Sequence, residues 1–107
     1  MDANRIVAAT PFEHFPSQPV PKHFTARVRR VGALRLPIAG PYCPRARLFQ
    51  YPDGRLVWLV RLWERDRAVP HLVSTAVLRE FARINRLPAV RAEVDALVER
   101  ATERTRP

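Results

Sequence analysis

Residues 45–67 decide the fold, and they read Arg-Ala-Arg-Leu-Phe-Gln-Tyr, then Pro-Asp-Gly, then Arg-Leu-Val-Trp-Leu-Val-Arg-Leu-Trp-Glu-Arg-Asp-Arg. Two runs rich in aromatic and β-branched residues flank Pro52-Asp53-Gly54, which is typical of a β-hairpin. Proline presets φ for the first corner, aspartate tolerates the second, and glycine supplies a positive φ. The stretch therefore predicts a central hairpin over residues 46–65, whose longer second run suits the middle strand of a sheet.

The length of the hairpin loop determines which side chains share a face. A three-residue loop pairs Tyr51 with Arg55, whereas a two-residue Asp-Gly loop would exchange the faces of the first run. We favour the three-residue loop because Pro52 suits a corner. In that register Leu48 joins Trp58 in the core. The opposite face then holds Arg47, Phe49, Tyr51, Arg55, Arg61, Trp63 and Arg65.

Before the hairpin, residues 1–22 form a proline-rich arm that either lies on the domain or hangs free. Four prolines exclude helix from Pro11 to Lys22 and favour extended backbone there, while Phe12 and Phe15 favour docking; residues 1–10 could form a short helix or strand. Alternation over residues 24–31 predicts a strand, and the break in phase at residues 30–32 predicts a bulge or tight turn. Leu34, Leu36 and Ile38 resume the alternation, and residues 37–44 read as a loop.

After the hairpin, residues 69–73 read as a connector or a short edge strand. Ser74 or Thr75 can cap a helix that ends near Asn85, and Pro88 can begin a second helix that ends near Thr102. The apolar stripes of these helices are Val77, Leu78, Phe81 and Ile84, and then Val90, Val94, Leu97, Val98 and Ala101. This order predicts one α+β domain over residues 23–107: a small antiparallel sheet of three to four strands within residues 23–73, with the helical hairpin 75–102 packed on one face.

The charge of the chain is large and unevenly distributed. Nineteen basic and ten acidic residues give a net charge of +9, and eighteen of the bases are arginine. A GC-rich coding sequence would enrich arginine everywhere, but residues 22–61 hold nine bases and one acid, whereas residues 62–107 hold nine bases and seven acids. The positive charge therefore gathers on the β half of the chain, which is typical of proteins that meet phosphates or acidic surfaces.

Several functional classes lack support in the sequence. Cys43 is the single cysteine, which favours an intracellular, cytoplasmic protein over a disulfide-bonded one, and no apolar run is long enough to span a membrane. A reactive Cys43 would need a base or second ligand that the sequence does not position. His14, His23 and His71 lie far apart, and no glycine-rich phosphate loop is present. We therefore expect no metal, no cofactor and no enzymatic activity.

The leading interpretation is a small regulatory or architectural protein that binds nucleic acid, DNA or RNA, through its sheet face. Guanidinium groups neutralise phosphates, and flat rings stack on bases. The candidate phosphate contacts are Arg27, Arg29, Arg30, Arg35, Arg45, Arg47, Arg55 and Arg61, and the candidate stacking groups are Phe49, Tyr51 and Trp63. The helices are less suited to this role because the second one exposes Glu93, Asp95 and Glu99.

Two alternatives stay open at this point. In the first, the aromatic rings pack beneath the N-terminal arm and the arginine side chains extend around them to solvent. In the second, the basic face docks on an acidic protein partner, or the chain forms a homodimer through an edge strand.

Overall fold

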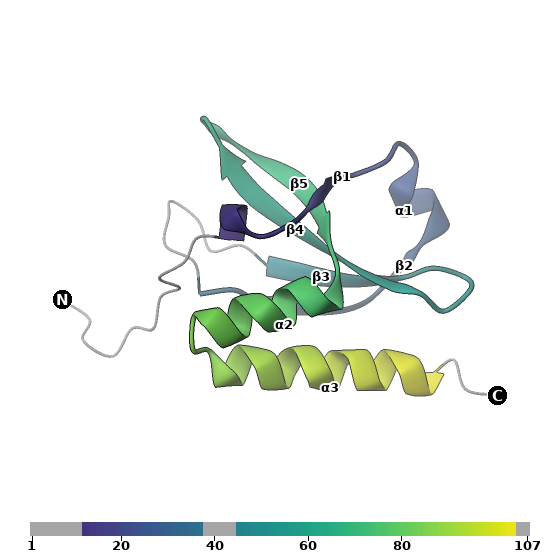
Figure 1. Cartoon of the computed structure of the whole chain (residues 1–107). Helices are drawn as coiled ribbons and strands as arrows, with labels where there is room; N and C mark the ends of the chain where they lie inside the picture. The colour runs from purple at the N-terminus through teal and green to yellow at the C-terminus, as the bar shows by residue number, and fades with distance from the viewer. Residues whose placement is uncertain (1–11, 38–44, 105–107) are drawn as a thin grey trace.

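A computed structural model describes residues 12–37 and 45–104, and it shows an α+β fold (Figure 1). The strands are β1 (Gln18–Pro19), β2 (Arg29–Arg35), β3 (Arg45–Gln50), β4 (Leu56–Glu64) and β5 (Arg67–Val73). The helices are the 3₁₀ turn η1 (Phe12–His14), α1 (Phe24–Arg27), α2 (Thr75–Ile84) and α3 (Pro88–Arg104). The strands form one antiparallel sheet in the order β1-β5-β4-β3-β2, and α2 and α3 cover one of its faces. The predicted fold class is confirmed, but the sheet has five strands instead of three to four.

The additional strands come from segments with weak sequence signals. β5 pairs with β4 from Glu64–Arg67 to Trp58–Val73, so residues 69–73 belong to a long hairpin. The turn of that hairpin, Arg65-Asp66, contains neither glycine nor proline, and Arg65 adopts φ 55° there. β1 pairs with β5 at the sheet edge, where a proline is tolerated because an edge strand leaves one row of its N–H groups outside the ladder.

The central hairpin has the predicted three-residue loop. The Tyr51 amide donates to the Arg55 carbonyl at 2.9 Å, and the Gly54 amide donates to the Tyr51 carbonyl at 2.9 Å. Gly54 adopts φ 95°, as the left-handed position of this loop requires. Leu48 lies opposite Trp58, and both are buried, which confirms the predicted register and faces of the hairpin.

The strand predicted over residues 24–31 is wrong in its first half. Phe24–Arg27 form the short helix α1, and β2 begins at Arg29. The chain turns after Pro21, whose carbonyl accepts from the Phe24 amide at 3.3 Å, and the turn drives the Phe24 ring into a small apolar cluster on the sheet. Burial of this ring outweighs a weak alternating pattern of only a few residues.

The predicted bulge lies in β2, where the register shifts between Arg30 and Gly32. A Cβ atom on Gly32 would lie 2.9 Å from Cδ2 of Leu97, so the glycine allows α3 to approach this strand closely. α3 consequently covers the β2 side of the sheet, next to α2 (Figure 1).

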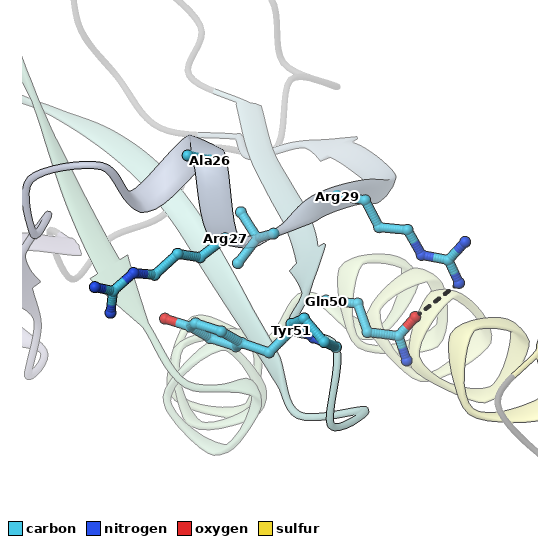
Figure 2. Close-up of a pocket in the computed structure, with 7 residues that line it drawn as sticks. Ala26, Arg27, Arg29, Gln50 and Tyr51 are labelled. Carbon is cyan, nitrogen blue, oxygen red and sulfur yellow. Dashed lines mark hydrogen bonds between the residues drawn. The ribbon is translucent and has the colours of Figure 1, made fainter.

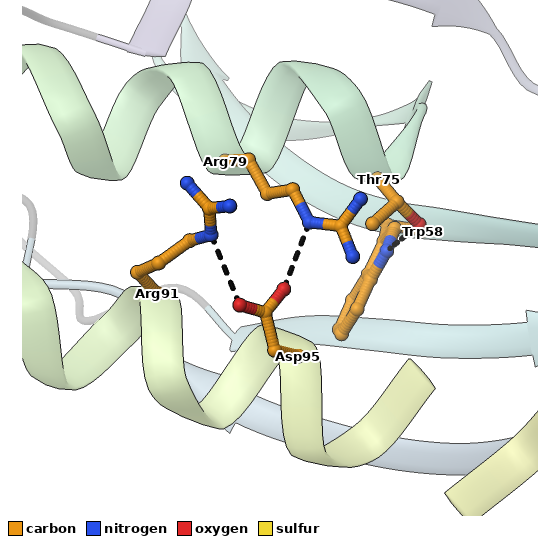
Figure 3. Close-up of polar contacts among 5 residues, drawn as sticks. All are labelled: Trp58, Thr75, Arg79, Arg91 and Asp95. Carbon is orange, nitrogen blue, oxygen red and sulfur yellow. Dashed lines mark hydrogen bonds and ion pairs between the residues drawn. The ribbon is translucent and has the colours of Figure 1, made fainter. Parts of the chain in front are cut away.

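The main core lies between the sheet and the two long helices, and Trp58 is its largest fully buried side chain. Its indole Nε1 donates to Oγ1 of Thr75 at 3.0 Å (Figure 3), which satisfies the one polar atom of the ring. Phe12 is fully buried and its ring centroid lies 5.0 Å from that of Phe81. Phe15 lies in the same cluster, so the expectation that the arm docks is confirmed for its described part. The boundary near residue 22 stays a prediction.

Both long helices begin as predicted. Oγ of Ser74 accepts from the Val77 amide at 3.2 Å and caps α2, and Pro88 is the first residue of α3. Leu78 and Phe81 are buried, whereas Ile84, the last member of the predicted apolar stripe, is 43% exposed. It occupies the last position of α2, at the edge of the packed face.

Candidate nucleic-acid interface

The sheet face opposite α2 and α3, here called the outer face, carries most of the predicted site residues. Ala46, Leu48, Val60 and Leu62 are buried toward the helices. Because side chains alternate along a strand, their neighbours point to the outer face. These neighbours are Arg45, Arg47, Phe49, Leu59 and Arg61.

One half of the outer face is apolar and covered by α1. Phe24, Leu59 and Leu72 form its buried cluster, and Phe49 and Tyr51 pack against it. The Phe24 ring meets Phe49 and Tyr51 in edge-on geometry, with centroids 5.4 and 6.2 Å apart. Two of the three predicted stacking groups thus already have ring partners within the protein. The third, Trp63, lies on β4, but its side chain is outside the described residues.

The other half of the outer face carries the arginine row, which we define as Arg35, Arg45 and Arg61. Arg35 lies directly opposite Arg45 in the β2–β3 ladder. The β3–β4 register, continued by one residue beyond the Ala46–Val60 pair, sets Arg61 on the other side of Arg45. Arg47 follows along β3, opposite Ala33 and Leu59. Since adjacent strands lie about 4.7–4.9 Å apart, these guanidinium groups share one small area of surface.

Among the described residues, no carboxylate forms an ion pair with Arg35, Arg45 or Arg47. Like charges directly opposite each other in a sheet are destabilising, so the juxtaposition of Arg35 and Arg45 has an unfavourable energy in the isolated protein. The surface is therefore suited to an anionic ligand.

Three arginines of α2 and α3 have carboxylate partners, in contrast to Arg35, Arg45 and Arg47 within the described residues. Asp95 accepts from Nε of Arg79 at 2.8 Å and from Nε of Arg91 at 3.0 Å (Figure 3). The Arg79 hydrogen bond is the largest cause that holds the pKa of Asp95 below its usual value. Arg83 pairs with Glu80 on α2, and this hydrogen bond lowers the pKa of Glu80 and raises that of Arg83. The charge on the helical side is thus largely compensated.

The remaining predicted arginines lie toward the other end of the strands. β3 runs from Arg45 to Gln50, and five residue steps at about 3.4 Å each place these positions about 17 Å apart. Arg30 lies on the outer face opposite Phe49, and Arg29 pairs with Gln50 in the ladder. The sequence therefore predicted one arginine site, whereas the structure divides those residues into two groups.

Arg55 lies outside the arginine row and has an acidic partner in the hairpin turn. Its Nε donates to Oδ2 of Asp53 at 2.7 Å, and its guanidinium carbon lies 4.7 Å from the Tyr51 ring centroid. The Asp53 carboxylate also accepts from the Arg55 backbone amide at 3.0 Å, and this bond is the largest cause of its lowered pKa. Arg55 thus stabilises the hairpin turn, and the Asp53 carboxylate is the ion-pair partner of its guanidinium group.

A groove opens where β2 and β3 stop pairing, and we call it the Tyr51 groove (Figure 2). It has a volume of about 360 Å³. Its walls are residues 26–29 at the α1–β2 junction and residues 50–52 at the end of β3. Arg27 and Arg29 extend from the first wall, so two further arginines border this opening.

Gln50 is a site residue that the sequence reasoning missed. It is only 3% exposed, and its amide donates to the carbonyls of Gly54 and Ala101 while its oxygen accepts from Arg29 at 3.2 Å. It therefore holds the hairpin turn, α3 and the start of β2 together. The available signal was a polar residue at a core-facing position, two residues after Leu48.

The sequence also raised the possibilities of a reactive cysteine and a metal site. Cys43 lies outside the described residues. Within residues 12–37 and 45–104, no three histidine, cysteine, aspartate or glutamate side chains gather as a metal site would require. The Ser17 hydroxyl lies 3.2 Å from Nδ1 of His71, but this is an exposed contact between β1 and β5.

None of the described helices combines the length and hydropathy needed to cross a bilayer. Comparison of the chain with protein-family models, curated proteins and solved structures gives no significant match.

Proposed function

We propose that the chain binds nucleic acid by its phosphate backbone, using the arginine row and Arg47 as the contact surface. The observation that supports this most strongly is the direct opposition of Arg35 and Arg45, without a carboxylate partner among the described residues. A phosphate backbone supplies closely spaced negative charges that relieve such repulsion. Contacts of this kind position a protein on the polymer without reading sequence, which suits an architectural or a regulatory role.

The packing of the aromatic residues refines the proposal. Phe49 packs edge-on against Phe24, so the centre of the outer face offers guanidinium groups in place of a free stacking ring. Binding at the arginine row is then governed by phosphate density, and DNA and RNA of equal length should compete for it.

The test is the salt dependence of binding to a short duplex, measured by fluorescence anisotropy. Each neutralised phosphate contributes about −0.9 to the slope of log K against log salt, so four arginines give a slope of about −3.6. The double variant Arg35→Gln/Arg45→Gln should reduce the magnitude of the slope by about 1.8. The control Arg100→Gln/Arg104→Gln removes the same charge from α3 and should leave the slope unchanged.

Equal effects of the two double variants would show that net charge, and not this surface, governs binding. Absence of salt-dependent binding would leave the acidic protein partner as the better hypothesis, because the same arginines would serve it. Homodimer formation through the β2 edge is less favoured. This edge strand contains a bulge and carries Arg29, Arg30 and Arg35, and both features oppose pairing with a second copy.

A further inference from the structure

The Tyr51 groove differs from the arginine row in shape and in composition. It lies at the opposite end of β3, and its walls contribute two arginines, the Tyr51 ring and the Gln50 amide (Figure 2). Its volume of about 360 Å³ is at the small end of the range for ligand sites. A groove of this size has room for a nucleotide of an unpaired strand and is too small for a base-paired helix.

The two arginines of the groove keep their positive charge uncompensated. Arg27 has no polar side-chain partner among the described residues, and Arg29 donates only to the neutral Oε1 of Gln50 at 3.2 Å. Figure 2 shows the two side chains extending in opposite directions along the groove, with Tyr51 and Gln50 beneath them. Because the two guanidinium groups diverge, they are poorly placed to contact one phosphate together. They are better placed to contact two separate phosphates of one nucleic-acid strand.

The Tyr51 ring lies between two openings of the surface. It lines the Tyr51 groove and also a second groove of about 420 Å³, which Arg55 lines as well. The guanidinium carbon of Arg55 lies 4.7 Å from the centroid of the Tyr51 ring. Of the two grooves, Arg55 lines only the second. An aromatic ring beside a groove, flanked by cations, suits single-stranded nucleic acid, because bases stack on rings while cations contact the backbone.

We infer that the Tyr51 groove binds an unpaired segment of a nucleic-acid strand. Arg27 and Arg29 contact phosphates at the two ends of the segment, and a base between them stacks on Tyr51. The inference rests on the proposed function and deepens it. The arginine row binds any phosphate backbone, whereas the groove adds a preference for a duplex that carries a single-stranded end.

The experiment compares a blunt duplex with a duplex that carries a short overhang, at equal total phosphate number and fixed salt. The wild-type protein should bind the overhang ligand about tenfold more tightly. Arg27→Gln should remove most of this difference and leave the affinity for the blunt duplex within twofold. Arg35→Gln/Arg45→Gln should weaken binding of both ligands by the same factor. Arg100→Gln is the matched single-charge control on α3 and should change neither affinity.

The role of the ring is tested separately, because Tyr51 also packs against Phe24. Tyr51→Phe keeps the ring and should retain the preference for the overhang. Tyr51→Leu should lose it, provided that its thermal unfolding shows a folded protein. If Tyr51→Leu does not fold, the Arg27→Gln result alone decides the inference.

The outcomes separate the two proposals. Equal affinity for blunt and overhang ligands, with salt-dependent binding intact, overturns the inference and leaves the proposed function standing. An overhang preference that Arg27→Gln does not change also overturns the inference. Loss of all salt-dependent binding overturns both.

Discussion

Phe12→Ala is the substitution that most directly tests whether residues near the N-terminus belong to the folded domain. The Phe12 ring is fully buried, and it contacts Phe15 and Phe81 with centroids 6.0 and 5.0 Å away. Truncation of a buried phenylalanine to alanine costs about 3–5 kcal/mol, because apolar contact is lost and a cavity remains. A domain of this length has a total stability of about 5–15 kcal/mol, so a third or more of it can disappear.

The assay is equilibrium urea unfolding followed by circular dichroism. The midpoint should fall strongly while the m-value stays the same, since the surface exposed on unfolding barely changes. Ile84→Ala is the control because it removes an apolar side chain that is 43% exposed, and it should cost well under about 1 kcal/mol. Equal small effects of both substitutions would refute the placement of Phe12 in the core and would restore a loosely attached arm.

Two further substitutions test other parts of the fold. Gly32→Val should destabilise the protein by about 1 kcal/mol in the same urea assay, which is the low end for overpacking because the tip of the Leu97 side chain can rotate. Ala33→Val, on the exposed face of the same strand, is the control and should leave the stability unchanged. Asp95→Asn breaks the ion pairs between α2 and α3 and within α3, and should cost about 0.5–1 kcal/mol at pH 7 because both pairs are half exposed. Since the pKa of Asp95 is lowered in the folded state, that stability is present above the unfolded pKa of about 3.9 and is lost as the pH falls through the folded pKa. Thermal unfolding of wild type and Asp95→Asn should therefore converge below about pH 4, and a constant difference down to pH 2 would contradict the assignment.

The elements that the sequence predicted well are those whose signals are local. Pro52-Asp53-Gly54 specifies a loop through its own φ preferences, and the loop sets the register of β3 and β4 without help from other residues. Ser74 and Pro88 likewise mark helix starts through hydrogen bonds and backbone geometry within one turn.

The elements that it predicted poorly depend on distant partners. Arg65 adopts a positive φ that its side chain does not favour, and β5 is stable there because it pairs along the length of β4. The Phe24 ring reaches Leu59 and Leu72, which lie far along the chain, so α1 forms in place of the predicted strand. Neither effect leaves a pattern in the neighbouring residues.

The sequence by itself determined the α+β class, the central hairpin and the concentration of positive charge on the β half. Only the tertiary structure decided how that charge is grouped. Strand pairing brings Arg35 beside Arg45, and Arg27 and Arg29 lie at a groove about 17 Å away along β3, while the Phe24 ring packs against Phe49, which was predicted to stack on bases. The physical reason is that charge and loop preferences are properties of single residues, whereas the neighbours of a side chain depend on the pairing of strands that are far apart in the sequence.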